Sequence, residues 1–277
     1  MSKPKGSVLL LSTGRTGTQF FARLINKFFP EIYAVHASPY STVINVLCNA
    51  YSAKLCPRVL IKWVWKLFKE KEISNCGSHT YIDSNNHLYQ FPQLYGQLYP
   101  NLRILHIVRD PRDYIKSHLN WAKGRKKSYV ANFIIPFWQP NGFLMGEYTL
   151  IRWLRLSQLQ RFAWIWCYKN NEIEKIESIG VPYCRIRFED VFNKFDKCSF
   201  IRAIEFMGLD FNNQLVDEIK VRKNESTYTW VKKWEDWSDK DCAQVDNICG
   251  SMMKKYSYGN EALWIEKVEK GKKLIYD

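Results

Sequence analysis

The first residues that could do chemistry form the segment Ser12–Gln19, which reads STGRTGTQ. It contains two glycines, several hydroxyl side chains and one arginine, Arg15. Glycine lets the backbone approach a bulky anion, hydroxyl and backbone N–H groups donate hydrogen bonds to it, and arginine supplies a fixed positive charge. The combination predicts a phosphate-binding turn. It is not a Walker A loop, because no lysine precedes the threonine. An ordinary strand–turn–helix with incidental glycines is the alternative.

A second group of charged and polar residues reads RDPRDYIKS, beginning at Arg109 and ending at Ser117. The apolar run Leu102–Val108 before it predicts a central strand. Asp110 and Pro111 are typical of a helix start, as N-cap and first helical residue. Arg109 then lies at the carboxyl end of a strand, with Ser117 roughly 10 Å along the helix. Both could contact one phosphate if the helix folds back over the strand end. The alternative is an Arg–Asp surface pair and a helical serine.

Polar residues also follow two other expected strands. His36 ends a strand expected at Ile32–Val35, while Asp83 and His87 follow a short strand around Tyr81. Ligands of open α/β sheets bind at the carboxyl ends of the strands, so these residues are candidates for chemistry. A structural role is the alternative for each of them.

The elements that must position these residues alternate along the chain. Val8–Leu11 predicts a buried strand, and apolar residues then recur at helical spacing from Phe20 to Phe28. Such alternation favours an α/β fold, with a mainly parallel central sheet covered by helices on both faces. We expect a single domain over residues 1–277, with an aromatic-rich insertion at about 122–168.

Composition narrows the possible partners. The chain has 277 residues with 41 Lys and Arg against 27 Asp and Glu, a net charge of +14, which favours anionic partners. The eight cysteines show neither C-x-x-C pairs nor zinc-ligand spacing, so we expect reduced thiols and a cytoplasmic protein. We find no signal peptide and no run near the roughly 18 apolar residues of a membrane span.

The segment Pro57–Glu72 is basic and amphipathic. Lys62, Lys66 and Lys69 fall on one face of the expected helix. Apolar residues cover the rest of it: Leu60, Ile61, Val64, Trp65 and Phe68. We expect a surface helix packed on the core. A membrane-surface helix and a wall of the acceptor site are the alternatives.

Taken together, the two phosphate signals resemble those of the sulfotransferases that use 3′-phosphoadenosine-5′-phosphosulfate (PAPS). Ser12–Gln19 is similar to the family's loop for the 5′-phosphosulfate. Arg109–Ser117 is similar to its 3′-phosphate motif, including the spacing of Arg and Ser. The RFED segment Arg187–Asp190 is also similar, so the resemblance spans most of the chain. It implies the P-loop-like sulfotransferase fold.

The resemblance also implies residue roles. Backbone amides of Gly14–Thr18 would hold the 5′-phosphate, and Arg15 would stabilise charge developing on the bridging oxygen as the sulfuryl group leaves. Arg109 and Ser117 would hold the 3′-phosphate. The implied cofactor-binding residues are Gly14, Arg15, Thr16, Gly17, Thr18, Gln19, Arg109 and Ser117. No metal is required.

The general base is left open among three residues. The family uses His or Glu, and His87 is our first choice because its position ahead of Arg109 resembles that of the catalytic His in the soluble branch. His36 is second, because related bacterial enzymes often carry a His–Glu pair there, although Ala37 occupies the Glu position. Asp83 is third.

The resulting expectation is an enzyme that transfers a sulfuryl group from PAPS to a hydroxyl or amine, releasing PAP. The aromatic-rich insertion suits a small-molecule or saccharide acceptor. One alternative is another P-loop-type phosphotransferase such as a small-molecule kinase. A non-catalytic polyanion-binding module is the other, although we expect no specific nucleic-acid partner.

Overall fold

The computed structural model describes residues 5–76, 80–124, 137–220 and 230–276. These residues fall into two compact units. The first unit consists of residues 1–108 together with 169–224, and the second of residues 109–168 together with 225–277. The helix α9 (Gln158–Glu174) contains one of the boundaries between them.

The first unit is built on a five-stranded parallel sheet in the order β2-β3-β1-β4-β5. The strands are β1 (Ser7–Ser12), β2 (Tyr33–His36), β3 (Tyr81–Asn85), β4 (Leu102–Val108) and β5 (Tyr183–Arg187). Because all pairs are parallel, the carboxyl ends of the strands share one edge, where Ser12 pairs with Ile107 and His36 with Ser84. The chain adds β2 and β3 on one side of β1, then β4 and β5 on the other. Doubly wound sheets bind ligands at such a switch point.

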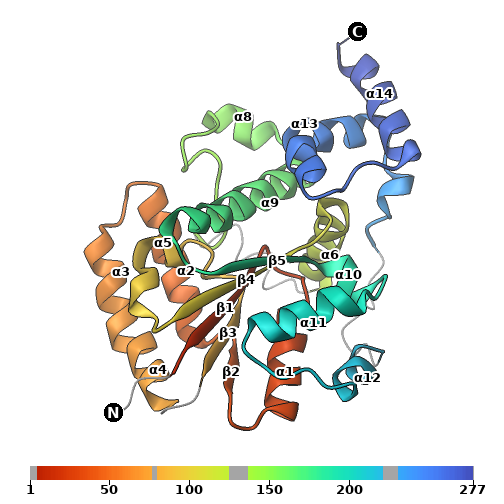
Figure 1. Cartoon of the computed structure of the whole chain (residues 1–277). Coiled ribbons are helices and arrows are strands. Elements are labelled where there is room, and N and C mark those ends of the chain that lie inside the picture. The colour runs from red at the N-terminus through yellow and green to blue at the C-terminus, as the bar shows by residue number, and fades with distance from the viewer. Residues whose placement is uncertain (1–4, 77–79, 125–136, 221–229, 277) are drawn as a thin grey trace. The chain divides into compact units, whose positions relative to one another are not determined.

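Helices cover both faces of this sheet (Figure 1). On one face, Val8 and Leu10 of β1 belong to a core shared with α1 (Thr18–Phe28) and α11 (Lys197–Phe206). The same face carries α10 (Phe188–Phe192) and α12 (Gln214–Lys220). The opposite face is covered by α2 (Pro39–Ser52), α3 (Arg58–Trp65), α4 (Lys71–Asn75) and α5 (Phe91–Tyr95). Short 3₁₀ turns span Gly96–Leu98 and Lys175–Ile179. The predicted α/β class is confirmed.

The described part of the second unit is helical. It contains α6 (Pro111–Gly124), α8 (Leu150–Arg155), the first part of α9, a 3₁₀ turn (Trp234–Asp236), α13 (Asp239–Lys255) and α14 (Ala262–Tyr276). The aromatic-rich segment predicted at about 122–168 falls mainly here, although its residues 125–136 lie outside the described residues. Trp153 and Trp164 pack edge to face in it, with ring centroids 5.2 Å apart.

The basic segment after Pro57 is helical as predicted, but the expected position of Lys69 is wrong. A π-helical turn (Lys66–Glu70) joins α3 to α4. This turn advances fewer degrees per residue than an α-helix, which rotates Lys69 away from the face of Lys62 and Lys66. Lys69 is fully buried, whereas the other two lysines are exposed.

The polar residues after Tyr81 belong to β3 rather than to a loop after it. Asp83, Ser84 and Asn85 are all buried in the strand. Lys69 donates to Asp83 at 2.6 Å, and Ser84 donates to the carbonyl of Thr18 at 2.6 Å. These partners satisfy the polar groups, so the strand extends further than its apolar pattern indicates.

Two further observations concern the chain as a whole. Among the residues that the structure describes, no helix is both long enough and apolar enough to cross a bilayer. Five cysteine side chains are buried: Cys48, Cys56, Cys76, Cys242 and Cys249.

His106 on β4 is predicted to make the protein less stable in acid. Its ring is fully buried between Tyr183 and Asn170, and burial lowers its pKa from 6.5 to about 4. The unfolded chain therefore binds a proton that the folded chain does not, and stability falls as pH drops from 6.5 towards 4. The shift corresponds to about 3 kcal/mol. Urea unfolding across this range should show a shallower pH dependence for His106→Gln; identical slopes would contradict the prediction.

Candidate functional site

The turn after β1 is the most unusual backbone in the first unit. Gly14, Arg15 and Gly17 all have positive φ angles, of 99°, 58° and 75°. Glycine adopts this region freely, but a side-chain-bearing residue such as Arg15 pays about 1–2 kcal/mol. Backbone strain of this kind concentrates at functional sites, where the surrounding structure enforces it.

Hydrogen bonds with side chains of β1 and β3 fix the conformation of this turn. Ser12 Oγ accepts from the backbone N–H of Gly14 at 3.1 Å and from Thr16 Oγ1 at 2.6 Å. Ser84 of β3 fixes the carbonyl of Thr18, the first residue of α1. The turn is therefore anchored to two neighbouring strands before any ligand arrives.

The turn also presents donors suited to an anion. Gly17 is the N-cap of α1, and as a glycine it has no side chain with which to cap this helix end. The first N–H groups of a helix have no intrahelical partner, and the helix dipole makes this end positive. Thr13 Oγ1 is buried and has no hydrogen-bond partner in the described part of the chain. A phosphate or sulfate is the kind of ligand that these groups can satisfy.

Gly17 lies directly against the ring of Phe192 in α10. A Cβ at this position would come within 2.6 Å of two ring carbons. Phe192 also packs edge to face on Phe20 of α1, with ring centroids 5.1 Å apart. The segment that follows β5, which includes the RFED residues, thus supports the shape of the turn.

Gly17→Ala is predicted to destabilise the protein by about 1–3 kcal/mol, because it adds backbone strain and a clash with Phe192. Gly180→Ala is the matched control, since Gly180 has a φ of 70° and open space around its Cβ position. Unfolding in urea should show the larger loss for Gly17→Ala. Equal losses would mean that the Phe192 contact contributes nothing.

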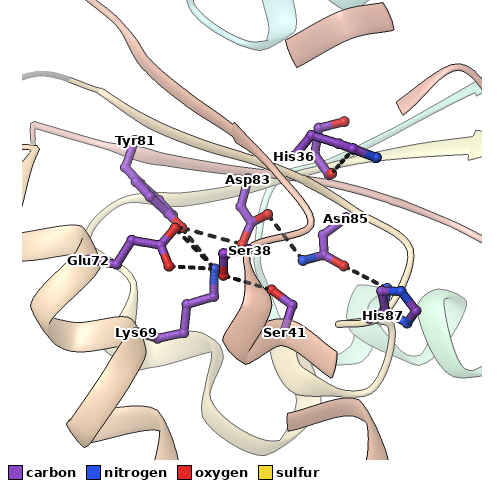
Figure 2. Close-up of polar contacts among 10 residues, drawn as sticks. His36, Ser38, Ser41, Lys69, Glu72, Tyr81, Asp83, Asn85 and His87 are labelled. Atoms are coloured by element: carbon purple, nitrogen blue, oxygen red, sulfur yellow. Dashed lines mark hydrogen bonds and ion pairs between the residues drawn. The ribbon is translucent and has the colours of Figure 1, made fainter. Parts of the chain in front are cut away.

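His36 is held in an orientation suited to proton transfer. It ends β2, its side chain is exposed, and its Nδ1 donates to the carbonyl of Ser84 at 2.8 Å (Figure 2). This bond places the ring proton on Nδ1, so in the neutral ring Nε2 is the acceptor.

His87 lies just beyond the end of β3 and is half-buried. Its backbone N–H donates to Asn85 Oδ1 at 2.8 Å (Figure 2). Burial, the largest cause, and the charges of Lys169 and His36 together lower the pKa of His87 from 6.5 to about 3. The ring is therefore neutral, with one unprotonated nitrogen, at neutral pH.

Asp83, the third candidate base, is occupied in a buried ion network. Its carboxylate accepts from Lys69 at 2.6 Å and from Tyr81 at 3.3 Å, and Lys69 also pairs with Glu72 (Figure 2). Asp83 and Lys69 are both fully buried. Removing either member of such a buried pair would leave the other charge uncompensated, so the geometry favours a structural role for Asp83.

Arg109 and Ser117 lie in the second unit. Arg109 directly follows β4, and its carbonyl accepts from Trp166 Nε1 at 2.9 Å. Asp110 Oδ1 accepts from the N–H of Arg112 at 2.9 Å, so the predicted cap of α6 is confirmed. Arg109 and Ser117 are both partly exposed.

Arg112 is a residue whose importance the sequence did not reveal. It is 1% exposed and lies between the rings of Trp234 and Trp264, at 4.4 and 4.9 Å from their centroids. Its guanidinium donates to Asp110 and, at 2.8 and 2.7 Å, to both carboxylate oxygens of Glu261. Arg112 thus connects the start of α6 to the segments near the C-terminus. We infer that its role is structural.

Lys169 is a second residue that sequence spacing did not single out. It lies in α9, is 1% exposed, and places Nζ 5.1 Å from the ring centroid of Tyr89. Burial lowers its pKa to about 7, and its charge acts on His87. A buried lysine whose pKa is lowered towards 7, and whose charge acts on a candidate base, is typical of functional sites.

Comparison with known proteins gives similarity at the level of structure. Protein-family models and curated proteins gave no match to the sequence. The structure is similar to that of mouse sulfotransferase SULT7A1 complexed with PAP, with 14% identity, a TM-score of 0.54, and coverage of 98% of this chain and 91% of that chain. This similarity shows a sulfotransferase-like fold, as predicted.

Two sulfotransferase domains were also found. One, from the curacin biosynthetic pathway, has 13% identity and a TM-score of 0.49, covering 82% of this chain and 80% of that chain. The other, from the Synechococcus PCC 7002 olefin synthase, has 13% identity and a TM-score of 0.47, covering 100% and 97%.

Proposed function

We propose that the protein is a sulfotransferase that moves a sulfuryl group from PAPS to a hydroxyl or amine of a small-molecule or saccharide acceptor. The observation that carries the proposal is the strained turn of Gly14, Arg15 and Gly17 at the start of α1, within a sulfotransferase-like fold. The mouse structure of similar fold contains PAP, which supports the choice of nucleotide. A cytoplasmic location belongs to the same proposal.

The residues of the turn fit the phosphosulfate end of PAPS. Thr13 Oγ1 is a buried hydroxyl with no described partner, and the N-cap residue of α1, Gly17, has no side chain to cap the helix. When bound, PAPS supplies the sulfuryl group. Backbone amides from Gly14 to Thr18 would hold the 5′-phosphate, and Gln19 would complete the site. Arg15 would stabilise the charge that develops on the leaving oxygen.

Arg109 and Ser117 would hold the 3′-phosphate of the nucleotide. Arginine suits this task because its planar guanidinium donates two parallel hydrogen bonds to a phosphate. A serine hydroxyl adds a further donor. Recognition of this phosphate would distinguish PAPS from nucleotides that lack it.

His87 is the proposed general base, with His36 as the second candidate. The lowered pKa of His87 keeps its ring unprotonated at neutral pH, as a general base requires. It also makes the ring only weakly basic, so proton transfer to it relies on the acceptor proton becoming acidic as sulfuryl transfer proceeds. The charge of Lys169 disfavours the protonated ring and so lowers the basicity of His87. His36 has the better-defined tautomer, and its exposed side chain would serve an acceptor entering from solvent.

A screen of hydroxyl and amine acceptors with labelled PAPS tests the activity directly. Transfer of label to an acceptor, lost in Arg15→Ala, is the expected result. Thermal shift with PAP, ATP plus Mg²⁺, and heparin separates the alternatives. Stabilisation by ATP with Mg²⁺ but not by PAP would favour a kinase. Stabilisation by heparin alone would favour a polyanion-binding module.

A further inference from the structure

The outward side of α3 exposes an unusual amount of apolar surface. Val59 is 75% exposed, Trp63 59% and Leu67 45%. Val59 and Trp63 lie in α3 and Leu67 in the π-helical turn that continues it, and their spacing of four positions places them in one stripe. Leu55, just before the helix, is 68% exposed. We name these four residues, together with Lys62 and Lys66, the α3 outer face.

This stripe is not part of the hydrophobic core, because it is the opposite side of α3 that packs on the core. Ile61 is 0% exposed, Val64 6% and Trp65 2%. Trp65 stacks on Phe91 with ring centroids 5.9 Å apart. Large apolar side chains gathered on a surface, beyond those that the core needs, mark an interaction site.

The charges around the stripe are almost all positive. Lys62 and Lys66 border it, and Lys54 and Lys71 are exposed at its two ends. Glu70 is the only acidic residue between positions 54 and 71. The π-helical turn strengthens the separation of the two sides, because it sends Lys69 inward to Asp83 while Lys62 and Lys66 stay exposed.

We propose that the α3 outer face docks on an anionic lipid surface. Val59, Trp63 and Leu67 would enter the boundary between headgroups and acyl chains, while Lys62 and Lys66 contact lipid phosphates and carboxylates. Helices that lie on membranes combine such an apolar face with lysines, and tryptophan favours this interface. This proposal is independent of the sulfotransferase assignment.

Other occupants fit the face less well. A nucleic acid or a sulfated glycan would engage the lysines but leave Trp63 and its apolar neighbours against water. A second copy of the chain, paired through the same face, would place lysines against lysines, since such an interface is self-complementary. An anionic bilayer satisfies both the apolar stripe and the charges.

Vesicle sedimentation tests the proposal with the full chain. The protein should bind vesicles of mixed phosphatidylcholine and phosphatidylserine but not phosphatidylcholine alone. Each lysine near an anionic membrane contributes about fivefold in affinity, so Lys62→Gln with Lys66→Gln should weaken binding roughly 25-fold. Trp63→Gln with Leu67→Gln should weaken it at least about tenfold. All four side chains are exposed, and unchanged thermal unfolding would confirm folding.

Leu274→Gln is the matched control, because Leu274 is 66% exposed in the second unit. It should bind vesicles like the unchanged protein; an equal loss would overturn the assignment to α3. Sensitivity to the lysine pair but not to the Trp63 and Leu67 pair would indicate purely electrostatic adsorption and would overturn the proposed insertion of the apolar stripe. Absence of vesicle binding, or a dimer that the Trp63 and Leu67 pair dissociates, would also overturn the proposal.

Discussion

His87→Ala is expected to lower turnover by about 10²–10⁴-fold, the usual contribution of a general base. PAP affinity should stay unchanged, because the proposed role of His87 lies towards the acceptor. Steady-state rates with labelled PAPS and calorimetric titration with PAP measure the two quantities separately. Full activity would contradict the assignment and move the role to His36.

The pH profile distinguishes a base from a structural histidine. The active form is the neutral ring, which is present above its pKa of about 3. The rate should therefore not decline through protonation of His87 as pH falls from 7 towards 5, where an ordinary histidine with a pKa near 6.5 becomes protonated. Lys169→Met removes a positive charge that lowers the pKa of His87, so it should move the acid limb to higher pH. An acid limb that Lys169→Met does not move would show that the charge of Lys169 does not act on the catalytic base.

Arg112→Ala is expected to lower the free energy of unfolding by about 3–5 kcal/mol. The change removes the cation from between Trp234 and Trp264 and leaves the buried Asp110 carboxylate uncompensated. Burial already raises the pKa of Asp110, an effect that hydrogen bonds from Arg112 partly offset. Without Arg112 this carboxyl protonates more readily, so the loss of stability should shrink as pH falls.

Arg103→Ala is the control for this effect. Arg103 is exposed and donates to the carbonyl of Phe206 at 3.2 Å. Its removal should cost less than about 1 kcal/mol, as is usual for a surface position. Urea unfolding of both variants makes the comparison, and similar losses would mean that the buried ion cluster does not stabilise the second unit.

Local sequence signals were sufficient to predict much of the fold. The apolar run Val8–Leu11 and the run Leu102–Val108 are bounded by turn residues, and both are strands of the central sheet. Asp110 and Pro111 predicted the start of α6 because capping depends on neighbouring residues alone. The two glycines of the turn after β1 both have positive φ, as a tight phosphate-binding turn requires.

Features that depend on distant residues were not predictable in this way. Glu261, which accepts hydrogen bonds from Arg112, lies 149 positions later in the chain. The RDPRD segment alone therefore did not indicate that Arg112 is buried. The burial of Lys69 depends on the π-helical turn and on Asp83, which no periodicity indicates. Lys169 becomes relevant to His87 only through the packing of α9.

Calorimetric titration with PAP and with adenosine 5′-monophosphate, using the unchanged protein and Arg109→Ala, tests the proposed function most directly. The unchanged protein should bind PAP more tightly, because in the proposed site Arg109 and Ser117 would contact the 3′-phosphate, which the monophosphate lacks. A hydrogen bond to a charged group contributes about 1.5–3 kcal/mol, so Arg109→Ala should weaken PAP binding by roughly 10–100-fold. Binding of the monophosphate should hardly change. Equal affinity of the unchanged protein for both nucleotides, or an unaltered PAP affinity in Arg109→Ala, would contradict PAPS as the cofactor.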